Sequence, residues 1–511
     1  MPLFDNNVLD DPVVYAASVD FRGGMNSTVL PHLLQDNQYA EAKNMQLTKS
    51  GRLATRPGSE IEGAMTAANP IKQLVWFDTV TGPYEELLAV HSGELKKWDG
   101  STFTTVGSFP AVTGEFSAFQ FFNKVVFVMP SAVWDYDGAT LAAVSTTGTA
   151  GNIACAHGNR VLRAGDTSNP ETLYISNLGA GGYATWGSGS MASLDIGAEG
   201  EIITGLKSWD VHNLLVFKER STYLVQTTTP QVTSPTSADW IIQPISSTIG
   251  CVAHKTAVQV GSDIWWLSQQ GVVSVRRLRQ ETQREIQDAV STPIQAYIDR
   301  INWSVAEKSA AVFHDNKYIL SVALDSATEP DHLLVYDTYH QVWSAYWTGL
   351  DSASLAVAYF SNEPLLHVGG TTGNLIKVDP DLSQDDGADL PSFVHMKAFN
   401  FNEPISPKSL LNIELEFQDS TALADLNLNF DGSTNDSLEA EDFATGVTLL
   451  TFPWTFPITF VEPRHLRKAI SLLQHRKVRQ VQPKLSADSG ILSLRSAVLS
   501  GFVETMLIET P

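Results

Sequence analysis

Two segments that lie far apart in the chain share one pattern: LLAVHSGELKKWD at residues 87–99 and LLHVGGTTGNLIKVD at residues 365–379. Each has a block of large apolar residues, then a turn, and then Gly-x-Leu-x-Lys-x-Asp ending at Asp99 or Asp379. This pattern is typical of an apolar β-strand, a tight turn and a second strand that closes on a turn-forming aspartate. The two copies stand near the ends of a long β-rich region, as the first and last units of a closed ring would.

Looser copies of the apolar strand recur between these segments, at an average interval of about 46 residues. Repeats of this length, each with several short strands, indicate the blades of a β-propeller. We therefore expect an all-β fold with about seven blades, six or eight being the alternatives; chance similarity within a β-rich chain is the competing explanation. The seven apolar runs begin at Glu85, Asn123, Asn159, Asn213, Asp263, Asn316 and Asn362.

One stretch inside this region has helical signals. Thr292 as N-cap, Pro293 in the first turn and Gln295 placed to reach back to the cap predict a helix start. The following isoleucines share one face and predict that the helix packs outside a blade: Ile294, Ile298 and Ile301.

The pattern changes after Asp381, where an acidic linker, LSQDDGADLP, leads into strictly alternating segments such as NIELEF from Asn412. Apolar Ile413, Leu415 and Phe417 alternate with glutamates, as in a half-buried antiparallel sheet. We expect a C-terminal antiparallel β-sandwich with one short helix near 463–473. The predicted organisation is an N-terminal segment over 1–65 that enters or closes the propeller, a propeller over 66–385 and a sandwich over 386–511.

The composition is acidic and poor in charge. The 511 residues include 33 Lys+Arg and 56 Asp+Glu, a formal net charge of −23, and only 17% of them are charged. This negative net charge disfavours nucleic-acid binding that depends on overall electrostatic attraction. Low charge is typical of surfaces that are covered in permanent assemblies. The N-terminus has acids where a signal peptide has bases, so we expect synthesis in a cytoplasm without export.

Motifs for catalysis or metal binding are missing from the sequence. There is no HExxH, GxSxG, phosphate loop or dinucleotide fingerprint. Cys155 and Cys251 have no metal or redox spacing and are expected to be buried thiols. We therefore expect no cofactor, no metal and no enzymatic activity, although paired carboxylates of a propeller glycosidase stay open as an alternative.

Alternating polar residues after the repeat resemble the start of a calcium loop: Asp379, Asp381, Ser383 and Asp385. The sixth position is Gln384 instead of glycine, and the twelfth is Leu390 instead of glutamate. We therefore interpret this stretch as a solvated linker.

A basic segment stands out in the acidic chain between residues 464 and 484. Two interpretations are open: a solvated basic face, or a docking surface for an acidic neighbour, where arginine forks are favoured. DNA binding is less favoured, because the basic residues are not accompanied by a pattern of aromatic residues that could stack on nucleobases. The candidate interface residues are Arg464, Arg467, Lys468, Arg476, Lys477, Arg479 and Lys484.

The segment VDFRGGMNSTVLPHLLQDNQYAEAKNMQLTKSGRLATRPG, residues 19–58, resembles the opening of phage tail nozzle proteins, the virion structural β-propellers of short-tailed phages. Its paired glycines permit unusual backbone conformations, and Pro-Gly favours a tight turn. A weaker resemblance continues through the array to NEPISPKSLLNIELEF from Asn402. The residues that carry the motif are Phe21, Gly23, Gly24, Asn26, Asn44, Gly51, Arg56, Pro57 and Gly58.

This resemblance implies a mechanical role in the virion tail. It implies a ring of six copies, a hexamer, below the portal and adaptor and in contact with other tail proteins. The ring would line a channel that holds and ejects the genome. DNA would pass along an acidic lumen without specific binding. The alternative is a tail-tip module that recognises host glycans, for which exposed tryptophans would be the discriminating feature: Trp265, Trp266, Trp343 and Trp347.

Overall fold

The computed structural model describes residues 13–79, 85–110, 114–130, 132–144, 150–184, 186, 193–197, 200–228, 236–276, 289–445, 465–473 and 477–504. Within them the fold is almost entirely β, as the sequence predicts. The chain forms two compact units, and each contains separate stretches of sequence. The first unit takes residues 1–59, 335–347 and 380–511, and the second takes 60–334 and 348–379. The units therefore interleave, whereas the ranges drawn from the sequence are consecutive.

The second unit is the predicted β-propeller, and its described strands form seven blades. Blade one contains β7 (Ile71–Asp78), β8 (Glu85–His91), β9 (Glu94–Trp98) and β10 (Phe103–Ser108). Blade two contains β11 (Ser117–Phe121), β12 (Lys124–Val128), β13 (Val133–Tyr136) and β14 (Leu141–Val144). Blade three contains β15 (Ile153–His157), β16 (Arg160–Ala164), β17 (Thr172–Ile175) and β18 (Ser193–Asp195).

The remaining blades follow in chain order. Blade four contains β19 (Ile203–Ser208), β20 (Asn213–Lys218), β21 (Thr222–Thr227) and β22 (Trp240–Ser246), and blade five β23 (Val258–Val260), β24 (Asp263–Ser268) and β25 (Gly271–Ser274). Blade six contains β26 (Ala310–His314), β27 (Lys317–Val322) and β28 (His332–Asp337). Within β28 the chain passes from the second unit to the first. Blade seven contains β30 (Ser352–Ala358), β31 (Leu365–Gly370), β32 (Asn374–Asp379) and β6 (Gly58–Ala64).

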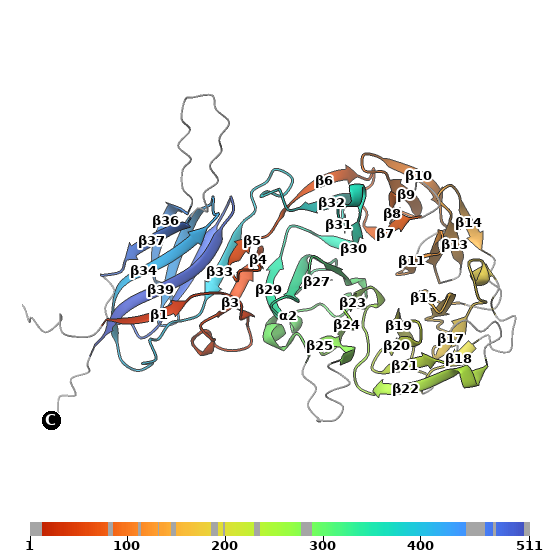
Figure 1. Cartoon of the computed structure of the whole chain (residues 1–511), viewed down its shortest axis with the longest axis horizontal. Helices are drawn as coiled ribbons and strands as arrows, with labels where there is room; N and C mark the ends of the chain where they lie inside the picture. The colour runs from red at the N-terminus through yellow and green to blue at the C-terminus, as the bar shows by residue number, and fades with distance from the viewer. Residues whose placement is uncertain are drawn as a thin grey trace, which may run out of the picture. The chain divides into compact units, whose positions relative to one another are not determined.

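The ring closes between the blades that carry the matched segments. Strand β30 of blade seven lies beside β7 of blade one, and the other inner strands follow one another around the same circuit, which Figure 1 shows. Strand β6 comes from the N-terminal part of the chain but forms the outer strand of blade seven. The last blade is therefore completed by residues that precede the first.

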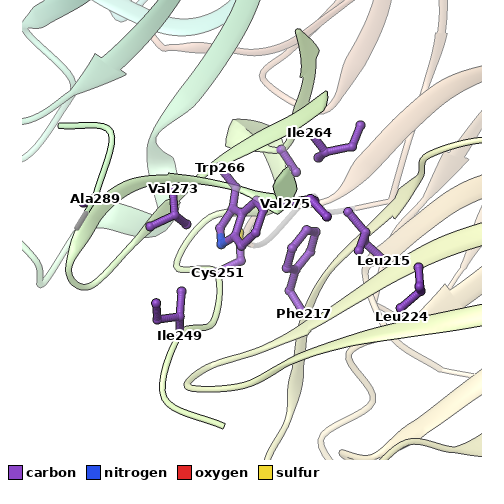
Figure 2. Close-up of a cluster of buried hydrophobic side chains, with 11 residues drawn as sticks. Leu215, Phe217, Leu224, Ile249, Cys251, Ile264, Trp266, Val273, Val275 and Ala289 are labelled. Carbon is purple, nitrogen blue, oxygen red and sulfur yellow. The ribbon is translucent and has the colours of Figure 1, made fainter. Parts of the chain in front are cut away.

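Large apolar side chains fill the space between neighbouring blades. Between blades four and five, the rings of Phe217 and Trp266 are 4.7 Å apart, and both side chains are fully buried. Figure 2 shows this cluster, in which Leu215 and Ile264 come from the two different blades. The indole of Trp266 donates to the carbonyl oxygen of Gly250 at 2.9 Å, so its one polar group is satisfied. Each such side chain contributes roughly 1.5–3 kcal/mol by burial.

The first unit is the predicted sandwich. One sheet contains β37 (His465–Ser471), β34 (Lys408–Gln418), β39 (Ser493–Val503), β5 (Leu53–Thr55) and β4 (Met45–Leu47), and β1 (Val14–Ser18) also pairs with β39. The other contains β29 (Val342–Trp347), β3 (Gln38–Lys43), β33 (Ser392–Met396), β38 (Val481–Ala487), β35 (Leu423–Phe430) and β36 (Ser433–Ala444), and β2 (Gly24–Met25) pairs with β3.

Strand β34 shows why this sequence makes a sandwich. Ile413, Leu415 and Phe417 are fully buried, whereas the side chains of Glu414 and Glu416 face solvent. The predicted alternation is confirmed, because a period of two places successive side chains on opposite faces of a strand.

The prediction of a short helix near 463–473 is wrong, because residues 465–471 form strand β37. This strand pairs antiparallel with β34, and its partly buried Leu466, Lys468 and Ile470 alternate with more exposed residues. Hydrogen bonds to β34 satisfy its backbone, so pairing with a strand distant in sequence overrides the local helical signals.

The helical stretch after blade five is shorter than expected. It consists of a 3-10 turn, η6 (Thr292–Ile294), and one α-helical turn, α2 (Gln295–Ile298). Ile294 and Ile298 are buried as predicted. The predicted cap is wrong: Thr292 donates its hydroxyl to the carbonyl oxygen of Ala289, and Gln295 turns to Asp299. Both side chains therefore bond locally to other groups in place of the reciprocal contacts of a capping box.

The other short 3-10 turns connect strands. They are η2 (Pro31–Leu33), η3 (Gly182–Ala184), η4 (Ser237–Asp239), η5 (His254–Thr256), η7 (Ala306–Lys308) and η8 (Phe360–Asn362).

Candidate functional site

The motif that carries the family resemblance belongs to the sandwich unit. Phe21 is fully buried, and its ring meets the ring of Tyr39 edge-on at 6.1 Å. Gly24 has a φ of +73°, and a Cβ there would lie 2.5 Å from the side chain of Val342. Only glycine combines this conformation with so close an approach. The Gly-Gly pair is therefore a structural requirement of the unit.

Arg56 is the central residue of the motif. Its side chain is fully buried, and its guanidinium makes two hydrogen bonds to the carboxylate of Asp385, at 3.0 and 2.6 Å. Ser59 donates its hydroxyl to the same carboxylate at 2.8 Å. Burial lowers the pKa of Arg56, while the hydrogen bond and charge of Asp385 oppose this shift. Asp385 is thus a specific ion-pair partner, which corrects its interpretation as part of a solvated linker.

The flanking motif residues support this ion pair. Asn44 has a φ of +53°, and its side-chain oxygen accepts a hydrogen bond from Nε of Arg56 at 3.3 Å. The backbone N–H of Gly58 donates to the carbonyl oxygen of Leu382 at 2.8 Å. A Cβ on Gly58 would lie 2.3 Å from the carbonyl oxygen of Gln384. The Arg-Pro-Gly turn and the acidic segment 382–386 are therefore packed against each other at backbone distance.

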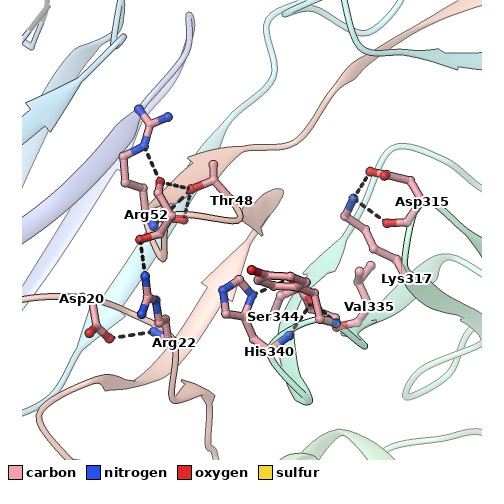
Figure 3. Close-up of polar contacts among 12 residues, drawn as sticks. Asp20, Arg22, Thr48, Arg52, Asp315, Lys317, Val335, His340 and Ser344 are labelled. Carbon is pink, nitrogen blue, oxygen red and sulfur yellow. Dashed lines mark hydrogen bonds and ion pairs between the residues drawn. The ribbon is translucent and has the colours of Figure 1, made fainter. Parts of the chain in front are cut away.

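Arginines also hold the loop around Gly51, as Figure 3 shows. The guanidinium of Arg22 donates to the carbonyl oxygen of Ser50 at 3.2 Å, and the backbone N–H of Arg52 donates to Thr48 Oγ1 at 3.1 Å. Arg52 also pairs with Asp419 at 3.0 Å. This loop is thereby joined to the end of β34.

The basic residues predicted as an interface are divided between two sheets. Arg467 and Lys468 lie on β37, where the register places Arg467 opposite Glu416 and Lys468 opposite the buried Leu415. Their side chains therefore point to opposite faces. Arg467 is 70% exposed and lies 3.9 Å from Glu414, and Lys468 lies over the ring of Phe443.

The remaining basic residues of the predicted interface belong to the segment that carries β38. Lys477 and Arg479 are exposed in the loop before this strand, and the backbone N–H of Arg479 donates to Asp431 at 2.7 Å. The ammonium of Lys484 lies 4.8 Å from the ring centroid of Phe393. Arg464 and Arg476 lie outside the described residues. The described bases thus come from β37, a loop and β38.

A second candidate site is the centre of the propeller, where residues from all seven blades line an open cavity of about 430 Å³. Its volume is within the range of small-molecule sites. The polar residues that line it include Gln73, Cys155, Lys207, Ser208, His254 and Gln259. Sequence reasoning missed this group, because its members belong to different blades and their polar positions within apolar strands give the only local signal.

Lys207 is the unusual residue of the cavity. Burial lowers the pKa of its ammonium, and the neighbouring Cys155 thiol opposes this shift only in part. Burial also raises the pKa of Cys155 to about 12. Among the described residues, no group makes an ion pair or hydrogen bond with the ammonium of Lys207. An unpaired charge in a desolvated place is costly for the protein.

His254 lies beside Lys207 in the neutral form. Its Nδ1 accepts a hydrogen bond from the backbone N–H of Leu206 at 3.3 Å, and it also has a backbone hydrogen bond to Ala154. Burial and then the charge of Lys207 lower its pKa to about 4. The neighbouring Lys255, in contrast, is paired with Glu115 at 2.5 Å. Lys207 therefore supplies the unneutralised positive charge of the cavity.

The tryptophans expected to be exposed in a glycan-binding module are core residues. Trp266, Trp343 and Trp347 are at most 2% exposed, and Trp265 is 9% exposed. These four residues therefore lack the exposure that would favour the glycan-binding alternative. Within the described ranges, no group of three or more histidine, cysteine or acidic side chains is arranged to hold a metal ion. Among those same residues, no helix has the length and apolar character needed to span a bilayer.

The chain is thus an all-β protein that combines a seven-bladed propeller with a β-sandwich. No family model matches it, and no curated protein matches it. Two solved structures of BBS1N in complex with ARL6DN, soaked with lead and with mercury, align at a TM-score of 0.39, with 12% and 10% identity. They cover 64% and 65% of this chain and 97% and 98% of theirs.

A third solved structure is the extracellular domain of the putative one component system BT4673 from B. thetaiotaomicron. It aligns with a TM-score of 0.42 and 9% identity over 88% of this chain and 63% of that one.

Proposed function

We propose that this chain is a structural subunit of a phage tail, a nozzle or hub protein whose copies form a ring around the channel that retains and ejects the genome. The observation that carries the proposal is the place of the resembling segment, residues 19–58, in the fold. Phe21, Asn44 and Arg56 of this segment are buried. The side chains of Asn44 and Arg56 donate hydrogen bonds to Pro391 and Asp385, which are more than 300 residues away in the sequence. The resemblance therefore concerns the framework of the molecule.

Charge supports the same role. A net charge of −23 repels the phosphate backbone, so an acidic channel would let DNA slide without the counterion release that accompanies tight binding. The low charged fraction of 17% suits a subunit whose surface is largely covered by its neighbours.

A fixed apolar turn in the sandwich unit is the place where we expect copies to meet. Leu30 and Leu33 are 61% and 64% exposed, although the turn η2 that carries them is held in place. The carbonyl oxygen of Pro31 accepts a hydrogen bond from the N–H of Ala398 at 3.0 Å, and that of Leu30 accepts one from Leu33 at 2.9 Å. An ordered turn that presents leucines to solvent costs little to dock, because its backbone is already fixed.

The test is the solution mass of the purified full chain, measured beside negative-stain electron microscopy. We expect a ring with a central channel, and we expect Leu30→Gln combined with Leu33→Gln to lower the mass to that of a single chain. Val211→Gln is the matched control, because Val211 is 57% exposed in the propeller unit, and it should keep the ring. A single-chain mass of the unmodified protein at every concentration would contradict the proposal.

A further inference from the structure

The central cavity of the propeller contains two polar groups without partners. The first is the ammonium of Lys207. The second is the side-chain amide of Gln73, whose oxygen is buried and has no hydrogen-bond partner among the described residues. Buried polar groups are nearly always satisfied in native proteins, so the Gln73 oxygen indicates that a hydrogen-bond donor is missing. The partly buried Lys207 lines the same cavity and has no counter-charge there.

We propose that this cavity binds a small organic anion, through a carboxylate or phosphate group that pairs with Lys207 and a second polar group that bonds to the amide of Gln73. The volume of about 430 Å³ suits a ligand of small-metabolite size. An anion there makes charge-assisted hydrogen bonds, which are among the strongest that a protein forms. This site is independent of the proposed tail function, since it lies within one propeller.

The other polar side chains of the cavity already have hydrogen-bond or ion-pair partners. We therefore expect the ligand to bind to Lys207 and Gln73. Ser117 donates to the carbonyl oxygen of Asn152, and Ser354 donates to that of Ile71. The amide of Gln120 is bonded to the carbonyl oxygen of Asp78, and Lys255 is paired with Glu115. The anion's charge would thus be neutralised by one lysine.

Neutral His254 fits this arrangement. Its Nδ1 is occupied by the Leu206 N–H, and its other backbone contact is to Ala154. The imidazole therefore fixes strand β19, which carries Lys207, instead of competing for the anion. Burial lowers the pKa of Lys207, so an anion that pairs with its ammonium replaces part of the lost hydration and stabilises the folded state.

The experiment measures thermal unfolding and calorimetric binding of the full chain with inorganic phosphate and with citrate, against chloride at equal ionic strength. We expect a saturable rise in melting temperature with at least one anion. Lys207→Met should weaken that anion's binding at least tenfold while melting no lower than the unmodified protein in chloride, because it removes an unpaired buried charge. Lys96→Met is the control, since Lys96 is paired with Glu94 and lies away from the cavity.

Three outcomes overturn the proposal. They are no saturable binding of either anion to the unmodified protein, an unchanged affinity in Lys207→Met, and an equal loss of affinity in Lys96→Met. If Lys207→Met does not fold, Gln73→Leu replaces it, with the same expected loss of affinity for the anion that binds the unmodified protein. Response to citrate but not phosphate would assign the ligand as a carboxylate, and the reverse as a phosphate compound.

Discussion

At the scale of single residues, the Arg56–Asp385 pair joins a fully buried guanidinium to a carboxylate far away in the sequence. We expect Arg56→Met and Asp385→Asn each to lower the free energy of unfolding by roughly 2–4 kcal/mol, because either change leaves a partner without its counter-charge in a desolvated place. The double variant should cost less than the sum of the two, since the remaining orphan is removed. Urea unfolding of the four proteins measures this coupling.

The control for that cycle is Arg300–Asp325, a pair of similar length, 2.7 Å, whose two side chains are 47% and 58% exposed. The same substitutions there should leave the urea midpoint almost unchanged, because solvent screens exposed charges. Equal effects at the two pairs would show that burial of Arg56 has no energetic role.

Two buried histidines should make stability depend on pH. Burial lowers the pKa of His157 and of His254 from 6.5 to about 4. In the unfolded chain both imidazoles take up protons below pH 6.5, but in the folded chain they stay neutral until about pH 4. Stability should therefore be complete above pH 6.5 and fall as the pH is lowered toward 4, by up to roughly 3 kcal/mol for each histidine.

Urea midpoints between pH 7.5 and 4.5 test this dependence. The slope should be shallower in His157→Gln, which removes one of the two groups. A midpoint that does not change between pH 7 and pH 5 would contradict the assignment of both imidazoles as neutral in the folded state.

At the scale of elements, the entry into strand β6 depends on the absence of a side chain at Gly58. We expect Gly58→Ala to destabilise the protein by roughly 1–3 kcal/mol, because its Cβ would meet backbone atoms of Gln384 that cannot move independently. Gly181→Ala is the matched control, since nothing lies within 4 Å of its Cβ position, and it should change stability by less than about 0.5 kcal/mol. Similar urea midpoints for the two variants would contradict the close packing at Gly58.

Elements were predictable from the sequence where their pattern is local. The alternation in β34 and the apolar runs of the blades predict strands directly. The order of apolar and polar residues within each strand shows whether one face or both faces are buried. Strand β37 was not predictable in this way. Its type depends on β34, which lies about 50 residues earlier, and no local signal contains that pairing.

At the scale of the whole molecule, the sequence predicted a propeller and a sandwich but not which segments of the chain belong to each unit. The ring follows from a repeat that can be counted along the sequence. The association of residues 14–18 and 53–55 with β39 depends on pairings between remote segments. The cavity was unpredictable for the same reason, since Gln73 and Lys207 meet only after the blades close the circuit.

The pairing of β1 with β39 also bears on how the protein is made. Residues 14–18 are synthesised well before their partners at 497–501, because the two segments lie far apart in the chain. At about 5–20 residues per second, the roughly 480 intervening residues take on the order of 25–100 s to translate. Strand β1 therefore stays unpaired while the blades fold, so chaperone demand and aggregation during synthesis should concentrate on the segment that carries β1.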